Sequence, residues 1–230
     1  MKKIIVFSIL SLVTFQIHAQ TARLSEAEID RKLGYIQAHF DEEYEKDHPW
    51  FWGWLAFNAT IFTASTTLYF ALEKGTPNQQ VQPIGMGVAT IAITSHVLLR
   101  PVSLSARDEI AEIKAQGRDE KLAKLRRAEE LFLKAYNRQK LTTGWFAHVG
   151  TFAVVLTSGL IEALYYDRVG FGIARFLVSL AIGEYRLYTQ PKLSKYRYDK
   201  YKAGDLSLSS YDKYPEANLY AGGFSFSMHF

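Results

Sequence analysis

Long apolar runs alternate with charged stretches along this chain of 230 residues. The runs cover Pro49–Leu72, Pro83–Leu99, Thr143–Tyr166 and Val169–Tyr185. Each is close to the ~20 residues that a transmembrane helix needs. Lipid cannot pair with backbone N–H and C=O groups, so such a run forms a helix unless it belongs to a closed barrel. None of the runs alternates strictly between apolar and polar residues, and the pattern therefore predicts an all-α, integral membrane four-helix bundle.

The second pair of apolar runs resembles the first pair. The segment Gly53–Ile61 (GWLAFNATI) recurs as Gly144–Phe152 (GWFAHVGTF), and Ile84–Ala89 (IGMGVA) recurs as Val169–Ala174 (VGFGIA). The motifs keep their order, which indicates a duplicated unit. We therefore predict two tandem helical-hairpin repeats. Their small residues, including Gly85, Gly87, Gly170 and Gly172, are expected to let neighbouring helices pack closely.

Amphipathic segments precede each hairpin. Ser25 begins a capping-box pattern, and apolar residues then recur at spacings of three and four up to His48, which predicts one helix over Leu24–His48. The segment Ser103–Leu141 shows the same periodicity with a break at Gly117, which predicts two helices. The expected organisation is repeat 1 over 20–104 with its membrane hairpin at 49–104, repeat 2 over 105–190 with its hairpin at 143–188, and a Tyr-rich tail over 191–230.

The amino terminus has the parts of a secretory signal. A basic start at Lys2 and Lys3 is followed by the apolar stretch Ile4–Ile17 and by the small residue Ala19. We expect a signal peptide over 1–19 and a mature chain that begins near Gln20. An uncleaved anchor helix is the alternative. The sequence contains no cysteine, so it has neither a disulfide framework nor thiolate metal ligands.

Export creates a conflict over orientation. A chain that starts outside the cytoplasm would carry its Lys/Arg-rich connector and tail on the outer side, whereas positive residues near spans normally stay cytoplasmic. The conflict disappears if the leader is an uncleaved span, if the hairpins do not cross fully, or if the protein lies in a bacterial outer membrane. We expect a multi-pass protein of the bacterial cell envelope, with the choice between inner and outer membrane left open.

The carboxyl terminus alternates apolar and polar residues and ends on an aromatic residue. Its apolar members are Phe224, Phe226, Met228 and Phe230. The last ten or so residues resemble the terminal strand by which outer-membrane barrel proteins are recognised. No set of other alternating strands accompanies them, so a barrel is not expected. A strand of this kind can instead add to the sheet edge of a partner.

Several polar residues fall inside or at the ends of the apolar runs, where ionisable groups are expensive and mark a pairing or functional role. They are Asn58, His96, Arg100, His148, Glu162, Arg175 and Glu184. Counting outward from the hairpin turns places Asn58 at the depth of His96, Glu162 near Arg175, and His148 near Glu184 and Arg186. Three interpretations follow: hydrogen bonds and an ion pair that fix helix docking, proton or ion handling, and bis-histidine haem ligation by His96 and His148, for which no attachment motif is present.

The sequence contains no nucleophile elbow, phosphate-binding loop, zinc-ligand spacing or dinucleotide fingerprint. The net charge of +4 resides in the connector and tail, where lipid phosphates are nearer than nucleic acid. We therefore expect no nucleic-acid binding, no cofactor and no metal. The favoured function is a non-enzymatic structural or accessory subunit of an envelope assembly, whose partners are the lipid bilayer and other envelope proteins or further copies of itself. The alternative is a small oligomeric transporter or ion- or proton-conducting protein.

Overall fold

The longest element of the computed structural model is the helix α2 (Glu26–Ala71), which has 46 residues. The structure describes residues 24–208, 215–220 and 223–228, so the expected signal peptide lies outside the described residues. Ser25 caps α2 and accepts a hydrogen bond from the Glu28 N–H at 3.3 Å. The helix continues through Pro49, where the sequence had suggested a boundary between an amphipathic helix and a span. Pro49 and Glu45 are both exposed, so the Glu45 carbonyl that loses its donor remains open to water.

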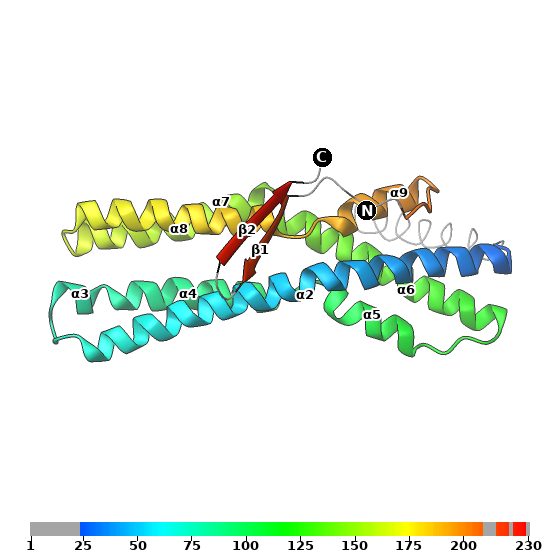
Figure 1. Ribbon diagram of the computed structural model, residues 1–230, viewed down its shortest axis with the longest axis horizontal. Coiled ribbons are helices and arrows are strands. Elements are labelled where there is room, and N and C mark those ends of the chain that lie inside the picture. The colour runs from blue at the N-terminus through cyan, green and yellow to red at the C-terminus, as the bar shows by residue number, and fades with distance from the viewer. Residues whose placement is uncertain (1–23, 209–214, 221–222, 229–230) are drawn as a thin grey trace, which may run out of the picture.

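The first hairpin folds back after α2. A short helix, α3 (Pro77–Gln80), leads into α4 (Gln82–Leu98), which runs antiparallel along the second half of α2 (Figure 1). Gly85 on α4 lies so close to Ser65 that a Cβ atom there would overlap the Ser65 hydroxyl. A side chain at position 85 would therefore force the Ser65 side chain to move at this helix crossing.

The connector forms the two helices that its periodicity predicted. They are α5 (Ser103–Glu112) and α6 (Arg118–Thr142), and Gly117 is the N-cap of α6. The Glu120 carboxylate accepts from the Gln116 N–H at 2.7 Å and so ties the loop to the first turn of α6.

The second hairpin consists of α7 (Trp145–Leu160), a π-helical turn η1 (Ile161–Tyr165) and α8 (Val169–Thr189). Its arms meet at Gly159 and Gly172: a Cβ on Gly159 would lie 2.8 Å from the Gly172 carbonyl oxygen. A Cβ added to Gly87 or Gly170 would meet no atom within 4 Å, so the packing role predicted for these two glycines is wrong, whereas it is confirmed for Gly85 and Gly172.

The tail contributes a helix and a hairpin. The helix α9 (Leu193–Lys202) packs on α6, and its Tyr198 and Tyr201 rings lie 5.2 and 5.7 Å from that of Phe132. The strands β1 (Pro215–Tyr220) and β2 (Gly223–Met228) pair antiparallel, with Leu219 opposite Phe224. The expected terminal strand is therefore present and pairs within its own chain. Phe230 lies outside the described residues.

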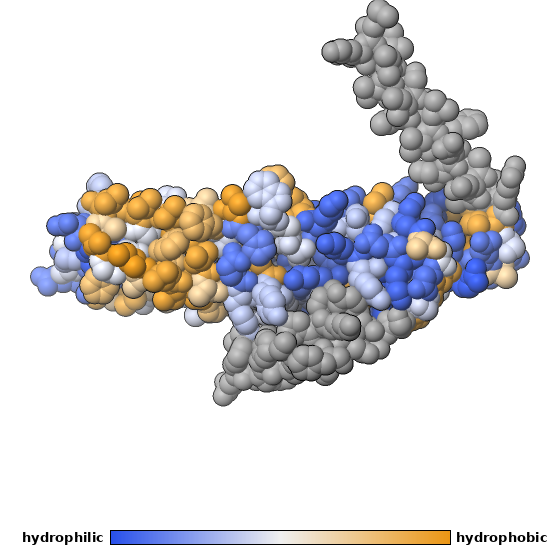
Figure 2. Space-filling view, turned by 90° about the horizontal axis from the view of Figure 1, so that it is seen from above, coloured by the Kyte–Doolittle hydropathy of each residue, from blue (hydrophilic) through white to orange (hydrophobic). Residues whose placement is uncertain are grey.

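The described chain is predominantly helical, as predicted, and forms an elongated body with two dissimilar halves (Figure 1). We call one half the hairpin half; it contains α4, α7, η1, α8 and residues 50–71 of α2. The other, the layer half, contains residues 26–48 of α2 with α5, α6 and α9. Its apolar core includes Ile29, Phe40, Ile110, Leu125 and Phe132. On the face seen in Figure 2, hydrophobic residues cover most of the hairpin half and hydrophilic residues cover most of the layer half.

Two helical segments, Pro77–Glu112 and Trp145–Tyr165, are long and apolar enough to cross a membrane. Only 17% and 22% of their most apolar windows are buried within the protein, whereas the core helix of a soluble protein would be mostly buried. The second half of α2 and α8 do not meet the same criterion. For α8 the reason is its content of Arg175, Glu184 and Arg186.

Candidate functional site

The polar residues of the first hairpin find partners close by in their own hairpin. The Asn58 amide donates to the Trp54 carbonyl at 2.7 Å, one turn earlier in the same helix. His96 Nε2 lies 2.8 Å from the Phe51 carbonyl oxygen, to which it donates, and its ring stacks on that of Phe51 with centroids 4.6 Å apart. The similar depth predicted for Asn58 and His96 therefore does not lead to a bond between them. Arg100 lies beyond the end of α4 and is exposed.

Glu162 and Arg175 form the ion pair that the hairpin count predicted. Glu162 is buried in the π-helical turn, and Arg175 Nε donates to its Oε2 atom. Sequence reasoning missed a second cation: Arg168 Nη1 lies 3.6 Å from Glu162 Oε1. The Arg168 guanidinium also covers the Phe171 ring at 4.0 Å and donates to the Pro77 carbonyl at 3.4 Å. This cluster links the tips of the two hairpins.

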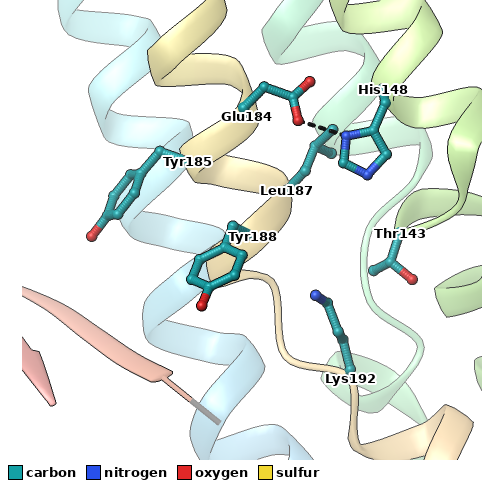
Figure 3. A pocket seen from close by; sticks show the side chains of 7 residues that line it. All are labelled: Thr143, His148, Glu184, Tyr185, Leu187, Tyr188 and Lys192. Atoms are coloured by element: carbon teal, nitrogen blue, oxygen red, sulfur yellow. Dashed lines mark hydrogen bonds and ion pairs between the residues drawn. The ribbon is translucent and has the colours of Figure 1, made fainter. Parts of the chain in front are cut away.

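His148 and Glu184 lie together in an open cleft where the second hairpin meets the layer half (Figure 3). His148 Nδ1 donates a hydrogen bond to Glu184 Oε2 at 2.6 Å, and both side chains are partly exposed. The cleft has a volume of about 480 Å³. Its lining residues are Thr143, His148, Glu184, Tyr185, Leu187, Tyr188 and Lys192.

Each of the two histidines considered for haem already uses one ring nitrogen for a protein partner: His96 for the Phe51 carbonyl and His148 for Glu184. Among the residues that the structure describes, no group of three or more His, Asp and Glu side chains is placed to hold a metal ion.

The layer half contains a buried polar network that sequence reasoning did not find. His39, Glu43 and Asp47 are spaced by four on one face of α2 and are all buried. Glu43 Oε1 accepts from the Gln139 amide and from the Ser194 N–H, each at 2.9 Å, and its Oε2 accepts from the Ser194 hydroxyl at 2.7 Å. The network joins α2, α6 and α9. Its only sequence signal is the acidic i, i+4 spacing within an otherwise apolar stripe.

The two acidic groups of this network differ in their protonation. Burial by itself would raise the pKa of Glu43, but the neighbouring His39 and the hydrogen bonds from Ser194 hold that pKa below its ordinary value. Burial raises the pKa of Asp47 well above its ordinary value; the Glu43 carboxylate adds to the shift, and the Ser103 hydroxyl, which donates to Asp47, opposes it. Glu43 is therefore stabilised in its charged form and Asp47 in its neutral form.

Ser194, His39 and Glu43 do not have the geometry of a nucleophilic triad. In a triad the carboxylate binds the histidine nitrogen opposite the one that faces the serine. Here His39 Nε2 faces both Ser194 Oγ, at 3.0 Å, and Glu43 Oε2, at 3.3 Å, while Nδ1 has no partner within the described part of the chain. Ser194 is also completely buried. The contacts instead hold α9 in place.

A buried arginine adds to this attachment of α9. Arg197 is only 2% exposed, its Nη2 atom donates to Glu42, and its backbone carbonyl accepts from the Tyr35 hydroxyl at 3.1 Å. The Tyr201 hydroxyl donates to Glu129 on α6. The first part of the tail is thus an integral element of the layer half.

Comparisons of the chain with protein-family models, with curated proteins and with solved structures found no match. Its function is therefore inferred from the geometry of the chain itself.

Proposed function

We propose that this protein is a non-enzymatic, membrane-embedded structural or accessory subunit of a bacterial envelope assembly. In this proposal both hairpins insert into the bilayer, so that the protein has four spans. The layer half lies in water beside the membrane and, together with the tail, binds other envelope proteins.

The observation that carries the proposal is the burial pattern of the hairpin half, which is the inverse of that of a water-soluble protein; we call it inverted burial. Large apolar residues lie on its outside, among them Phe70, Leu164 and Phe171, while many of its buried positions are small or polar, such as Gly85, Ala89 and Ser158. A water-soluble protein rarely exposes so large an apolar surface. The surface suits lipid as its solvent.

The dimensions of the hairpins support the same proposal. The segment Trp145–Tyr165 has 21 residues, which corresponds to about 31 Å of helix. The hydrocarbon core of a bilayer is about 30 Å thick. Polar loops at the hairpin tips and the hydrophilic layer half would then lie on opposite sides of the membrane.

The local pairing of polar side chains favours a structural role over transport. Hydroxyl groups within the hairpins bond back to their own helices: Thr60 to Ala56, Thr66 to Phe62 and Thr157 to Ala153, at 2.8 to 2.9 Å. Each of these hydroxyl groups uses its one donor hydrogen within its own helix, which is the arrangement expected of residues that pack in lipid. Replacing His96 or His148 with Gln should accordingly leave proteoliposome permeability unchanged.

Partner binding is tested with a truncation chosen from the structure. Deletion after Gln190 would remove Ser194 and Arg197 and so disrupt the layer half. A chain that ends at Leu208 keeps α9. We expect this shorter deletion to retain the melting temperature in detergent and to lose the stoichiometric envelope proteins that co-purify with the full chain.

Two results would contradict the proposal. Release of the protein from membranes by alkaline carbonate would exclude insertion. A proton or ion flux in proteoliposomes that disappears with His96→Gln would favour the transporter instead.

A further inference from the structure

The cleft beside His148 lies at the boundary between the two halves of the molecule. His148 is in the first turn of α7, and Glu184 and Tyr188 are in the last two turns of α8, where the apolar surface gives way to the hydrophilic one. If the hairpins are inserted as proposed, this boundary coincides with the level of the lipid headgroups. Tyr185 and Tyr188 flank the cleft, and tyrosine rings favour that level.

The charge in the cleft that lacks an ionic partner is that of Lys192. Among the described residues its ammonium group forms no ion pair, and its contact is with the Tyr188 ring at 5.6 Å. The negative charge of Glu184, in contrast, is bonded to His148 Nδ1. The Lys192 ammonium group is thus available to an anion in the cleft, whereas the Glu184 carboxylate is already bonded to His148.

The polar atoms around the cleft converge. In Figure 3 the second ring nitrogen of His148 points away from Glu184, toward the space that Lys192 and Thr143 also face. Lys192 supplies an ammonium group, and His148 presents its second ring nitrogen to the same space. An ammonium group and a histidine ring around one small volume suit an oxyanion, and phosphate is the oxyanion found at headgroup level.

An apolar strip runs from the cleft toward the hairpin tip. Phe152 follows His148 by one turn on α7, and Ala181 and Leu177 precede Glu184 on the same side of α8; all three are exposed. An acyl chain attached to a phosphate in the cleft would lie along these residues and bury apolar surface. A free phosphate ion would gain nothing from them.

We propose that this cleft binds the phosphate group of a membrane glycerophospholipid, with Lys192 as the principal contact, His148 as the second, and an acyl chain along Phe152 and Leu177. The inference rests on the proposed membrane insertion of the hairpins. It adds a specific lipid site to that function, at the junction where the hairpins are held against the layer half.

The test measures binding to the full chain in detergent micelles by titration calorimetry. The probe is a short-chain phosphatidylglycerol, dioctanoyl phosphatidylglycerol. Dioctanoylglycerol lacks the phosphate and glycerol phosphate lacks the chains, so the three probes separate the contribution of each part. We expect saturable binding of the phospholipid and much weaker binding of the two fragments.

Lys192→Gln should weaken phospholipid binding roughly fivefold, the value expected for one lysine at a lipid phosphate. Lys202→Gln makes the same change of charge at an exposed position on α9 outside the cleft, and it should bind like the unsubstituted protein. Equal binding by Lys192→Gln and the unsubstituted protein would overturn the proposal. So would dioctanoylglycerol or glycerol phosphate binding as tightly as the phospholipid.

Failure of this inference can be told apart from failure of the proposed function. A protein that alkaline carbonate releases from membranes contradicts insertion, whatever it binds. A protein that stays in the membrane and whose Lys192→Gln variant binds phospholipid normally contradicts only the lipid site.

Discussion

The two halves of this molecule expose opposite kinds of residue. In the layer half Leu125 and Phe132 are completely buried and charged side chains cover the outside. In the hairpin half Leu164 and Phe171 are 75% and 62% exposed, while Glu162 is buried. A single helix, α2, passes from one half to the other. In the proposed function this difference reflects two solvents acting on one chain, with water around the layer half and lipid around the hairpins.

The halves also satisfy their buried polar groups in different ways. The layer half joins segments far apart in the sequence, as where Glu43 accepts from Gln139 and Ser194. The hairpin half uses neighbours in the same hairpin, as where Asn58 donates to Trp54 and Arg175 to Glu162. In lipid a helix must satisfy its polar groups before it meets other helices, which favours local partners. In water a polar group is hydrogen-bonded by solvent until folding brings a distant partner to it.

The largest expected effect comes from replacing one leucine in each half, a buried one in the layer half and an exposed one in the hairpin half. Leu125→Ala removes a completely buried side chain and should lower the free energy of unfolding by about 3–5 kcal/mol. Leu164→Ala removes an exposed one and should change it little when the protein is in detergent. Thermal melts followed by circular dichroism compare the two. Equal losses would contradict the inverted burial.

Breaking the ion pair of the second hairpin should have the next largest effect. Arg175→Ala leaves the buried Glu162 carboxylate with Arg168 alone, at 3.6 Å, and should destabilise by about 2–4 kcal/mol. Glu162→Gln combined with Arg175→Gln removes both charges and should recover part of that loss. Thermal melts in detergent measure all the variants. Strictly additive losses would show that the two residues do not interact.

The close approach of α7 and α8 can be tested with two glycines of one helix. In Gly172→Ala the new methyl group would overlap the Gly159 carbonyl and Ala163, so we expect a loss of about 1–3 kcal/mol. Gly170→Ala, in the same turn, meets no atom within 4 Å and should be neutral or slightly stabilising. A Gly172→Ala variant as stable as Gly170→Ala would contradict the observed crossing.

The smallest effect concerns Asp47 and depends on pH. Because folding raises the pKa of Asp47, stability falls as pH rises above the ordinary aspartate value, where the unfolded chain ionises and the folded chain keeps its proton. Asp47→Asn should therefore gain roughly 1–2 kcal/mol over the unsubstituted protein at neutral and alkaline pH, and this gain should vanish in acid.

Glu43 supplies the control, because folding lowers its pKa. Its contribution to stability is present above the ordinary glutamate value and is lost as pH falls through the lower value of the folded state. Glu43→Gln should consequently destabilise at neutral pH. Urea unfolding over a range of pH distinguishes the two variants. The same sign for both would refute the opposite protonation of these groups.

The sequence predicted the features that depend on local pattern. The hairpins follow from the apolar runs, the break between α5 and α6 from Gly117, and the Glu162–Arg175 pair from counting outward along one hairpin. It missed the features that depend on tertiary contacts. Pro49 suggested a boundary, although the stripe of buried residues on α2 continues through Asp47 to Phe51 and holds the helix together.

The buried network was missed for the same physical reason. Glu43 and Asp47 look like ordinary surface residues of an amphipathic helix, and only the docking of α9 buries them. Arg168 and the strand β1 also depend on partners that folding brings together. In the candidate cleft, sequence reasoning placed His148 near Glu184 but gave no reason to add Lys192, which lies on the segment after α8.

Insertion of the hairpins across a membrane is the central claim, and cysteine accessibility tests it most directly. The natural chain has no cysteine, so single substitutions carry no background. Lys74 lies at the tip of the first hairpin and Lys114 in the layer half, and both are exposed. In sealed vesicles of one orientation, a membrane-impermeant maleimide should label only one of Lys74→Cys and Lys114→Cys until detergent opens the vesicles. Labelling of both in sealed vesicles would contradict the account.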